Sequence, residues 1–274
     1  AEERAQDRDA AEDRHALLGL LEAVLQQAAE QHRLAGPHGD GGHRGGLCQF
    51  IAGDLEMIDL HTHSIFSDGD LVPAEHLRRV EVLGYSAVAI TDHADASNMD
   101  FIIPRLVKVA EELKTHSPTV LLPGIELTHI PPALIFELTQ RARDLGAKVV
   151  VGHGETVAEP VASGTNMASL LAGVDILAHP GFLTLEEAEI AAQKGIFLEL
   201  SGRKGHCLTN GHVARLAEEV GAPLSVNADA HGPADFLTAE MAEKVGRGAG
   251  LSISRYDRLR EDMAAFVDRL TSPT

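Results

Sequence analysis

The chain has 274 residues, of which 23 are basic and 41 are acidic, so its formal net charge is -18. This charge argues against binding to nucleic acid or to a membrane surface through bulk electrostatics. No apolar run approaches the length of a membrane span, and the N-terminus lacks the apolar core of a secretory signal. The only two cysteines, Cys48 and Cys207, lie far apart, so neither a disulfide framework nor a thiolate zinc site is indicated. We therefore expect a cytoplasmic protein with a substantial core.

The first 56 residues do not share the pattern of the rest. The apolar positions that recur there at helical spacing are Leu17, Leu18, Leu21, Val24, Leu25 and Ala28. They predict one amphipathic helix, and the glycine-rich residues 36–46 have the composition of a flexible linker. We expect residues 1–56 to be a disordered or non-native extension, and residues 57–274 to form the functional domain. Deletion of the extension should then leave activity intact.

A short apolar run, residues 57–60, ends in two histidines, His61 and His63. Side chains at positions i and i+2 of an extended backbone point the same way, so both imidazoles can reach one metal ion. Such a pair alone is a weak signal, because two nearby histidines often lie at a surface without binding a metal.

The same arrangement recurs along the chain. Short apolar runs are followed by Asp92 and His93, by Glu126, by His153, by His179, and by Asp229 and His231. If the strands are parallel, their carboxyl ends meet on one face, where α/β barrels place their chemistry. Histidines with structural roles would not all fall at strand ends. The sequence therefore predicts a shared metal centre.

Helical segments alternate with these apolar runs. The predicted helices span residues 73–82, 104–116, 132–145, 167–171, 184–194, 210–220, 238–245 and 255–270. The predicted strands number seven when residues 196–200 are included. Strands that alternate with helices imply parallel pairing and right-handed crossovers.

The order of these motifs resembles the polymerase and histidinol phosphatase (PHP) domain family. The matching motifs are His61-Thr62-His63 with a following Asp68, Thr91-Asp92-His93, Glu126, His153, His179-Pro180, and Asp229-Ala230-His231. The resemblance covers about four fifths of the chain. It implies an α/β fold, a distorted (β/α)7 TIM-like barrel, which the short helical extension precedes.

The resemblance also implies how these side chains share metal ions. His61, His63, Glu126 and Asp229 would hold one ion, Glu126 would bridge to a second ion on His153 and His179, and Asp68, His93 and His231 would hold a third. Nine ligands are too many for one zinc ion. We expect two or three divalent ions, and the mixed imidazole and carboxylate ligands suit zinc, manganese or iron.

Several divalent ions would make a cationic pocket suited to a phosphate dianion. A hydroxide that bridges two ions is a nucleophile near neutral pH, because metal binding lowers the pKa of water to about 7. We expect hydrolysis of a small phosphate monoester, as in the histidinol-phosphatase-like or nucleotide-phosphatase-like members of the family. Asp229, His231 and Arg203 are the expected catalytic residues. Arg203, Lys204 and His206 follow the sixth strand and are candidates for binding the phosphate, although a solvated loop is the alternative.

Other functions stay open. A phosphodiesterase or an exonuclease on short nucleotides is the nearest alternative, although ten aromatic residues are few for a base-stacking platform. An amidohydrolase usually bridges its metals with a modified lysine on the fourth strand, where this chain has His153. A structural module is a further alternative, but such modules often lack ligands that this chain retains. We expect a small phosphorylated metabolite as the partner, and no extended nucleic acid or membrane.

Other polar residues receive structural roles. We expect surface or core positions for His76, His116, His129 and His212. Asp92 should orient a ligand without binding metal itself, and Asp59 should make structural hydrogen bonds. Glu199 lies inside a predicted strand, where a carboxylate that faces the barrel needs a partner.

Overall fold

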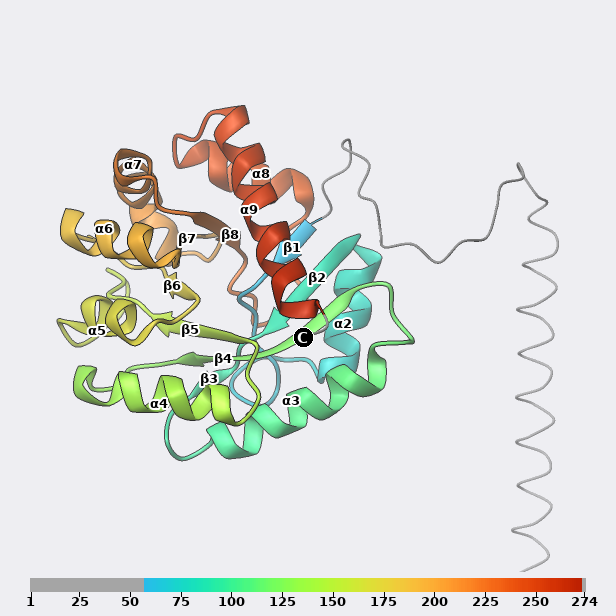
Figure 1. Cartoon of the computed structure of the whole chain (residues 1–274). Helices are drawn as coiled ribbons and strands as arrows, with labels where there is room; N and C mark the ends of the chain where they lie inside the picture. The colour runs from blue at the N-terminus through green and yellow to red at the C-terminus, as the bar shows by residue number, and fades with distance from the viewer. Residues whose placement is uncertain (1–56, 273–274) are drawn as a thin grey trace, which may run out of the picture. The chain divides into compact units, whose positions relative to one another are not determined.

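The computed structural model describes residues 57–272 (Figure 1). The predicted helix over residues 17–28, the glycine-rich linker and the extension as a whole lie outside the described residues. None of the described helices is long and apolar enough to cross a membrane.

A parallel sheet forms the centre of the molecule. Its strands are β1 (Met57–Asp59), β2 (Tyr85–Ile90), β4 (Val120–Leu127), β5 (Val149–His153), β6 (Ile176–Ala178), β7 (Phe197–Ser201) and β8 (Leu224–Asn227). They pair in chain order, and the two-residue strand β3 (His93–Ala94) extends the pairing with β4. The seven predicted strands are confirmed, and β3 is the one short addition.

The last strand returns to the first. The backbone N–H of His63 donates to the carbonyl of Ala230 at 2.8 Å, and that of Asp229 donates to the carbonyl of His61 at 3.0 Å. These bonds lie beyond the carboxyl ends of β1 and β8, where Thr62 also pairs with Ala230. The sheet is therefore nearly closed into a TIM-like barrel, as predicted.

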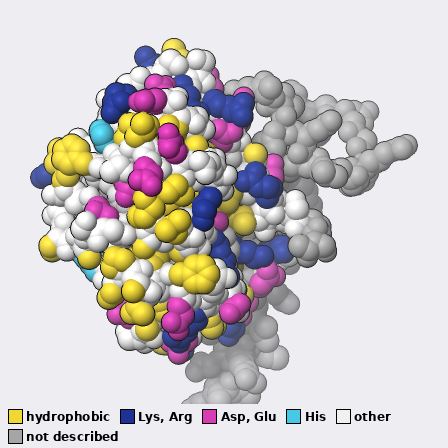
Figure 2. All heavy atoms as spheres, turned by 60° about the vertical axis from the view of Figure 1, so that its left-hand side comes forward, with side chains coloured by type: hydrophobic (Ala, Val, Ile, Leu, Met, Phe, Trp, Pro, Cys, Tyr) yellow, Lys and Arg dark blue, Asp and Glu magenta, His cyan; other side chains and the backbone are white. Residues whose placement is uncertain are grey.

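Helices cover the outside of the sheet (Figure 1). They are α2 (Pro73–Val82), α3 (Met99–Leu113), α4 (Pro132–Asp144), α5 (Thr165–Ala172), α6 (Leu185–Lys194), α7 (Asn210–Val220), α8 (Ala239–Gly248) and α9 (Ile253–Thr271), with a short 3-10 helix η1 (His206–Thr209). The predicted bounds of α2 and α7 are correct to the residue. Figure 2 shows acidic, basic and apolar side chains mixed over the described part of the face that it presents, without a continuous basic stripe.

The start of α3 differs from the prediction. The helix begins at Met99, so Pro104 lies inside it instead of opening it. Proline in a helix interior removes a hydrogen bond and costs about 3 kcal/mol. Four fully buried side chains on this helix outweigh that cost, because they pack in the core: Met99, Ile102, Ile103 and Leu106. The helix therefore continues through its proline.

Local signals set the bounds of α6. The Thr184 hydroxyl accepts a hydrogen bond from the backbone N–H of Glu187 at 3.2 Å, and the Glu187 carboxylate accepts one from the backbone N–H of Thr184 at 2.8 Å. This capping box satisfies two N–H groups at the helix start. Gly195 ends the helix with a φ of +68°, which glycine adopts without strain. The chain then enters β7, which pairs with β6.

Candidate metal centre

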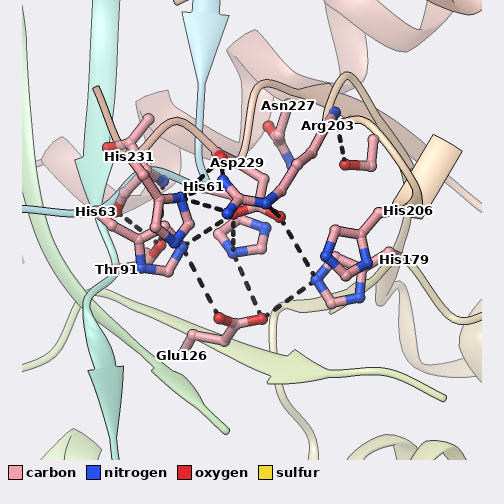
Figure 3. Close-up of polar contacts among 12 residues, drawn as sticks. His61, His63, Thr91, Glu126, His179, Arg203, His206, Asn227, Asp229 and His231 are labelled. Carbon is pink, nitrogen blue, oxygen red and sulfur yellow. Dashed lines mark hydrogen bonds and ion pairs between the residues drawn. The ribbon is translucent and has the colours of Figure 1, made fainter. Parts of the chain in front are cut away.

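The nine predicted ligands lie on one face, at or just after the carboxyl ends of the strands, with Asp68 on the loop that follows β1, and Figure 3 shows most of them near Glu126. Their ligand atoms fall into groups whose members lie within 4.8 Å of one another. These groups are His61, His63 and Asp229; Glu126, His153 and His179; and His63, Asp68, His93 and His231. The groups correspond closely to the three expected ion positions, with His63 close to two of them.

Glu126 lies at the centre of the cluster. Its Oε1 is 3.4 Å from His61 Nε2 and 3.5 Å from His179 Nε2. Its Oε2 is 2.8 Å from His93 Nδ1 and 3.9 Å from His63 Nε2. Burial raises the pKa of this carboxyl, but the surrounding histidines hold it well below its usual range. Glu126 is thus a carboxylate within reach of histidines from every group, the position that a bridging ligand requires.

Several buried polar atoms here have no hydrogen-bond partner in the described chain. They include Nε2 of His61 and of His63 and Oε1 of Glu126. Unpaired polar atoms inside a protein are costly, so they point to a missing partner. Burial lowers the pKa of His61, but the carboxylates of Glu199 and Glu126 raise it well above its usual value. The cluster therefore favours a positive charge at its centre, and its residues fit divalent metal ions.

The carboxylate of Asp68 lies at the exposed edge of the centre. Its Oδ1 is 3.2 Å from His231 Nε2 and 3.6 Å from His93 Nε2. Asp92 holds the loop that carries Asp68, because it accepts hydrogen bonds from the backbone and hydroxyl groups of Ser64 and Ser67 at 2.7 to 3.1 Å. Asp92 thus supports the loop that carries a predicted ligand, and the expectation that it does not bind metal itself stays a prediction.

Close packing of two loops places His153 beside His179. The backbone N–H of Gly154 donates to the carbonyl of Ala178 at 3.0 Å. A Cβ at Gly154 would collide with that same carbonyl, so only glycine fits there. The two imidazoles lie with their ring centroids 4.5 Å apart. A residue without a side chain after β5 therefore lets the two imidazoles lie side by side.

Glu199 on β7 has a role that sequence reasoning left unassigned. Its Oε2 accepts a hydrogen bond from His61 Nδ1 at 2.7 Å and another from the Asn227 amide at 3.0 Å. With Nδ1–H held by Glu199, Nε2 of His61 is the nitrogen left available to an ion. Asp59 accepts hydrogen bonds from the backbone N–H groups of His61 and Ala228, as predicted, and burial raises its pKa to about 7.

The loop after β7 places Arg203 against the centre. Its guanidinium Nη1 donates to the carbonyl of Asp229 at 3.0 Å and lies 2.6 Å from His231 Nδ1 (Figure 3). Burial raises the pKa of the Asp229 carboxyl to about 6. Lys204 is exposed in the same loop. His206 is buried, stacks on His179 at 4.2 Å between ring centroids, and shares a 2.8 Å hydrogen bond with Thr156.

His129 lies at the surface, as expected, but not away from the strand ends. It follows β4 by two residues and lies with His153 and Glu159 in a further group of potential ligands. Glu159 was not a candidate either, because it follows no apolar strand and its loop has no pattern. His212, by contrast, has the structural role expected, with Nε2 2.7 Å from the carbonyl of Leu183.

These features define a class of protein: a parallel α/β barrel with a histidine and carboxylate centre at the carboxyl ends of its strands. The PHP domain model matches residues 59–172. An uncharacterized protein of Methanocaldococcus jannaschii is 50% identical over 197 residues, which are 71% of this chain and 90% of that protein. The chain therefore belongs to the PHP domain family.

Solved structures share the fold at low sequence identity. Histidinol phosphate phosphatase of Lactococcus lactis, in complex with zinc, L-histidinol and phosphate, is 17% identical, with a TM-score of 0.53 over 72% of this chain and 95% of that one. A chain of an archaeal ribonuclease P complex with mature tRNA is 14% identical, with a TM-score of 0.59 over 77% and 90%. A Xaa-Pro dipeptidase is 11% identical, with a TM-score of 0.55 over 78% and 75%. At these identities the likeness supports the barrel fold only.

Proposed function

We propose that the protein is a metal-dependent hydrolase that acts on a small phosphate monoester. The observation that supports this most directly is the gathering of the nine predicted ligands into groups whose ligand atoms lie within 4.8 Å of one another, with buried ligand atoms that lack a partner in the described chain. Membership of the PHP domain family agrees with it.

The proposed ligand assignment follows the observed groups. His61, His63 and Asp229 would hold one ion, His153 and His179 a second, and Asp68, His93 and His231 a third, with Glu126 shared between the first two. Divalent ions bound here would supply Lewis acidity and an activated water near neutral pH. Only three of the nine side chains are carboxylates, so they cannot cancel the charge of three divalent ions. The pocket would therefore attract a phosphate dianion even though the protein as a whole is acidic.

Arg203 is the proposed phosphate-binding side chain. Nδ1 of His231 faces two groups, the Asp229 carbonyl at 3.1 Å, which only accepts a hydrogen bond, and Arg203 Nη1, which only donates. If His231 holds an ion through Nε2, its Nδ1 carries the proton and donates to the carbonyl. Nη1 of Arg203 then loses that acceptor. The N–H of Nη1 that is not bonded to the Asp229 carbonyl can then bind a phosphate oxygen, for which a planar guanidinium is suited.

The remaining assignments from the sequence stay proposals. Asp229 and His231 would act at the reacting centre through their positions among the ligands. His206 is buried beside His179, where it can line the space for the alcohol part of the ester. Lys204 is exposed, and any role for it would be a supporting contact with the phosphate.

Elemental analysis combined with phosphate release tests the proposal. The purified full chain should contain two or three divalent ions and should release phosphate from monoesters, with histidinol phosphate and nucleotides in the panel beside diesters. His61→Ala and Asp229→Ala should abolish turnover. His116→Ala is the matched control, because this histidine is exposed. An ion-loaded protein that cleaves only diesters would favour a phosphodiesterase instead, and an ion-free, inert protein would contradict the proposal.

A further inference from the structure

His129 and Glu159, which are not among the nine predicted ligands, form a group with His153, which is one of them. We call these three residues the outer group. Glu159 Oε2 lies 3.2 Å from His129 Nε2 and 3.2 Å from His153 Nε2. For bond lengths of about 2.0 to 2.2 Å in a tetrahedral site, neighbouring ligand atoms are separated by roughly this distance. Nε2 of His206 lies 3.5 Å from the other oxygen of Glu159. The outer group is thus built like a metal site.

The backbone conformation of His129 is a second, independent observation. Among the described residues, three that are not glycine have a positive φ: His129 at 52°, His179 at 29° and Asp229 at 52°. Such conformations are strained for residues with a side chain and tend to occur at functional sites. The other two residues are proposed metal ligands. His129 shares this conformation, and its Nε2 lies against Glu159.

His153 belongs to the outer group and to the inner one. Its Nδ1 lies 3.2 Å from the carbonyl of Gly154, which can only accept, so Nδ1 carries the proton and Nε2 is the ligand atom. The same nitrogen therefore serves both groups, the outer one with His129 and Glu159 and the inner one with Glu126 and His179. One imidazole nitrogen binds one ion at a time, so His153 can serve the outer position or the inner position, but not both at once.

The two groups differ in exposure. The side chains of His129 and Glu159 are 42% and 38% exposed, whereas those of His153 and Glu126 are 2% and 0% exposed. A hydrated divalent ion that enters the buried centre directly would lose its water before it gained ligands, which is costly. A carboxylate and an imidazole at the rim can replace some of that water first. His153 can then stay bound while the outer ligands are exchanged for the inner ones.

We propose that His129 and Glu159 form an outer cation position through which divalent ions enter and leave the centre, with His153 as the ligand common to both steps. This inference rests on the proposed metal centre but makes a separate claim about the rate of exchange. A position that lowers the barrier for entry lowers it equally for exit. It changes how fast ions are exchanged and leaves the number bound at saturation unchanged.

The test measures ion exchange without any substrate. The full chain is stripped with a chelator, mixed with zinc, and the free zinc is followed with a chromophoric chelator. Release is followed after addition of excess EDTA. Glu159→Gln removes the charged ligand. His129→Asn removes the imidazole without a change of charge, and asparagine tolerates a positive φ. Both variants should slow uptake and release several-fold and should bind as many ions at saturation as the wild type.

Two controls separate a ligand effect from a general loss of charge. Asp70→Asn removes one negative charge from the same rim, where the backbone of Asp70 is bonded to His231, and His116→Asn removes an exposed histidine elsewhere. Both should exchange zinc at the wild-type rate. Unchanged rates in Glu159→Gln and His129→Asn would overturn the outer position, as would a lower ion count, which would make them permanent ligands. A wild-type protein that binds no zinc would overturn the metal centre as well.

Discussion

Glu199 Oε2 lies 2.7 Å from His61 Nδ1, and both side chains are fully buried. The two residues are 138 positions apart in the chain. The negative charge of Glu199 fixes the tautomer and the orientation of the imidazole, so that Nε2 of His61 faces Glu126. Burial raises the pKa of Glu199, but the neighbouring imidazole of His61 outweighs this and holds the pKa below its usual value. Glu199 thus stays ionised to hold the histidine.

Replacement of Glu199 by alanine should weaken ion binding. Loss of such a partner typically lowers metal affinity by about 10- to 100-fold. Glu199→Gln should cost less, because an amide oxygen still accepts from Nδ1–H. Equilibrium dialysis against zinc measures the affinity. Glu189→Ala, on the exposed side of α6, is the control. Equal affinities for Glu199→Ala and the control would contradict the orienting role.

Replacement of Asp68 should remove one ion. Its carboxylate is half-exposed and lies between His93 and His231 at the edge of the centre. Without it the third position keeps imidazoles alone, and the histidine rings can turn. Elemental analysis of Asp68→Ala should give one ion fewer per chain than the wild type. Asp70→Ala, two residues along the same loop, should keep the full number. An unchanged count in Asp68→Ala would exclude Asp68 as a ligand.

Replacement of Arg203 should impair turnover of a phosphate monoester. A hydrogen bond to a charged group contributes about 1.5 to 3 kcal/mol, so Arg203→Ala should lower kcat/KM by roughly 10- to 100-fold. Arg203→Lys should recover only part, because an ammonium cannot make the paired bonds of a guanidinium. Lys204→Ala should have a smaller effect, since that side chain is exposed. Steady-state kinetics on one substrate compares the three variants. An equal loss in Lys204→Ala would argue that the loop acts by charge alone.

His76 should make the stability of the ion-free protein depend on pH. The side chain is buried on α2 with its ring nearly perpendicular to that of Phe236, and burial lowers its pKa from 6.5 to about 4. Below pH 6.5 the unfolded chain binds a proton at His76 that the folded chain does not bind. The contribution of His76 to the free energy of unfolding is therefore complete above pH 6.5 and is lost as the pH falls towards 4, by about 3 kcal/mol at most.

Urea unfolding of the ion-free protein between pH 7.5 and 4.5 measures this dependence. His76→Leu should reduce the fall in the free energy of unfolding, because leucine has no proton to gain. His116→Leu, at an exposed histidine, should follow the wild type. If His76→Leu loses as much stability at low pH as the wild type, other groups carry the dependence.

Local patterns in the sequence were enough to predict the alternating strands and helices and the gathering of the candidate ligands on one face, whereas the barrel was implied by the family resemblance. Apolar strand runs that end in a histidine or a carboxylate place those side chains at the carboxyl ends of parallel strands, and parallel strands meet at one face. Local signals also fixed the bounds of α7, which ends before Gly221 and was predicted to the residue. The start of α3 was misplaced, because the core contacts of Met99 that hold the helix beyond Pro104 are not a local property.

Only the tertiary structure decided how residues outside the pattern serve the centre. Glu199 needed a partner, and closure of the barrel supplied His61. His129 and Glu159 come from two different loops, 30 positions apart, and meet because β4 and β5 are neighbours in the sheet. The polar residue that follows each apolar strand can be recognised from the local sequence. Contacts between loops depend on how far each loop folds over the rim. That is set by packing against other loops and produces no repeating pattern in the sequence.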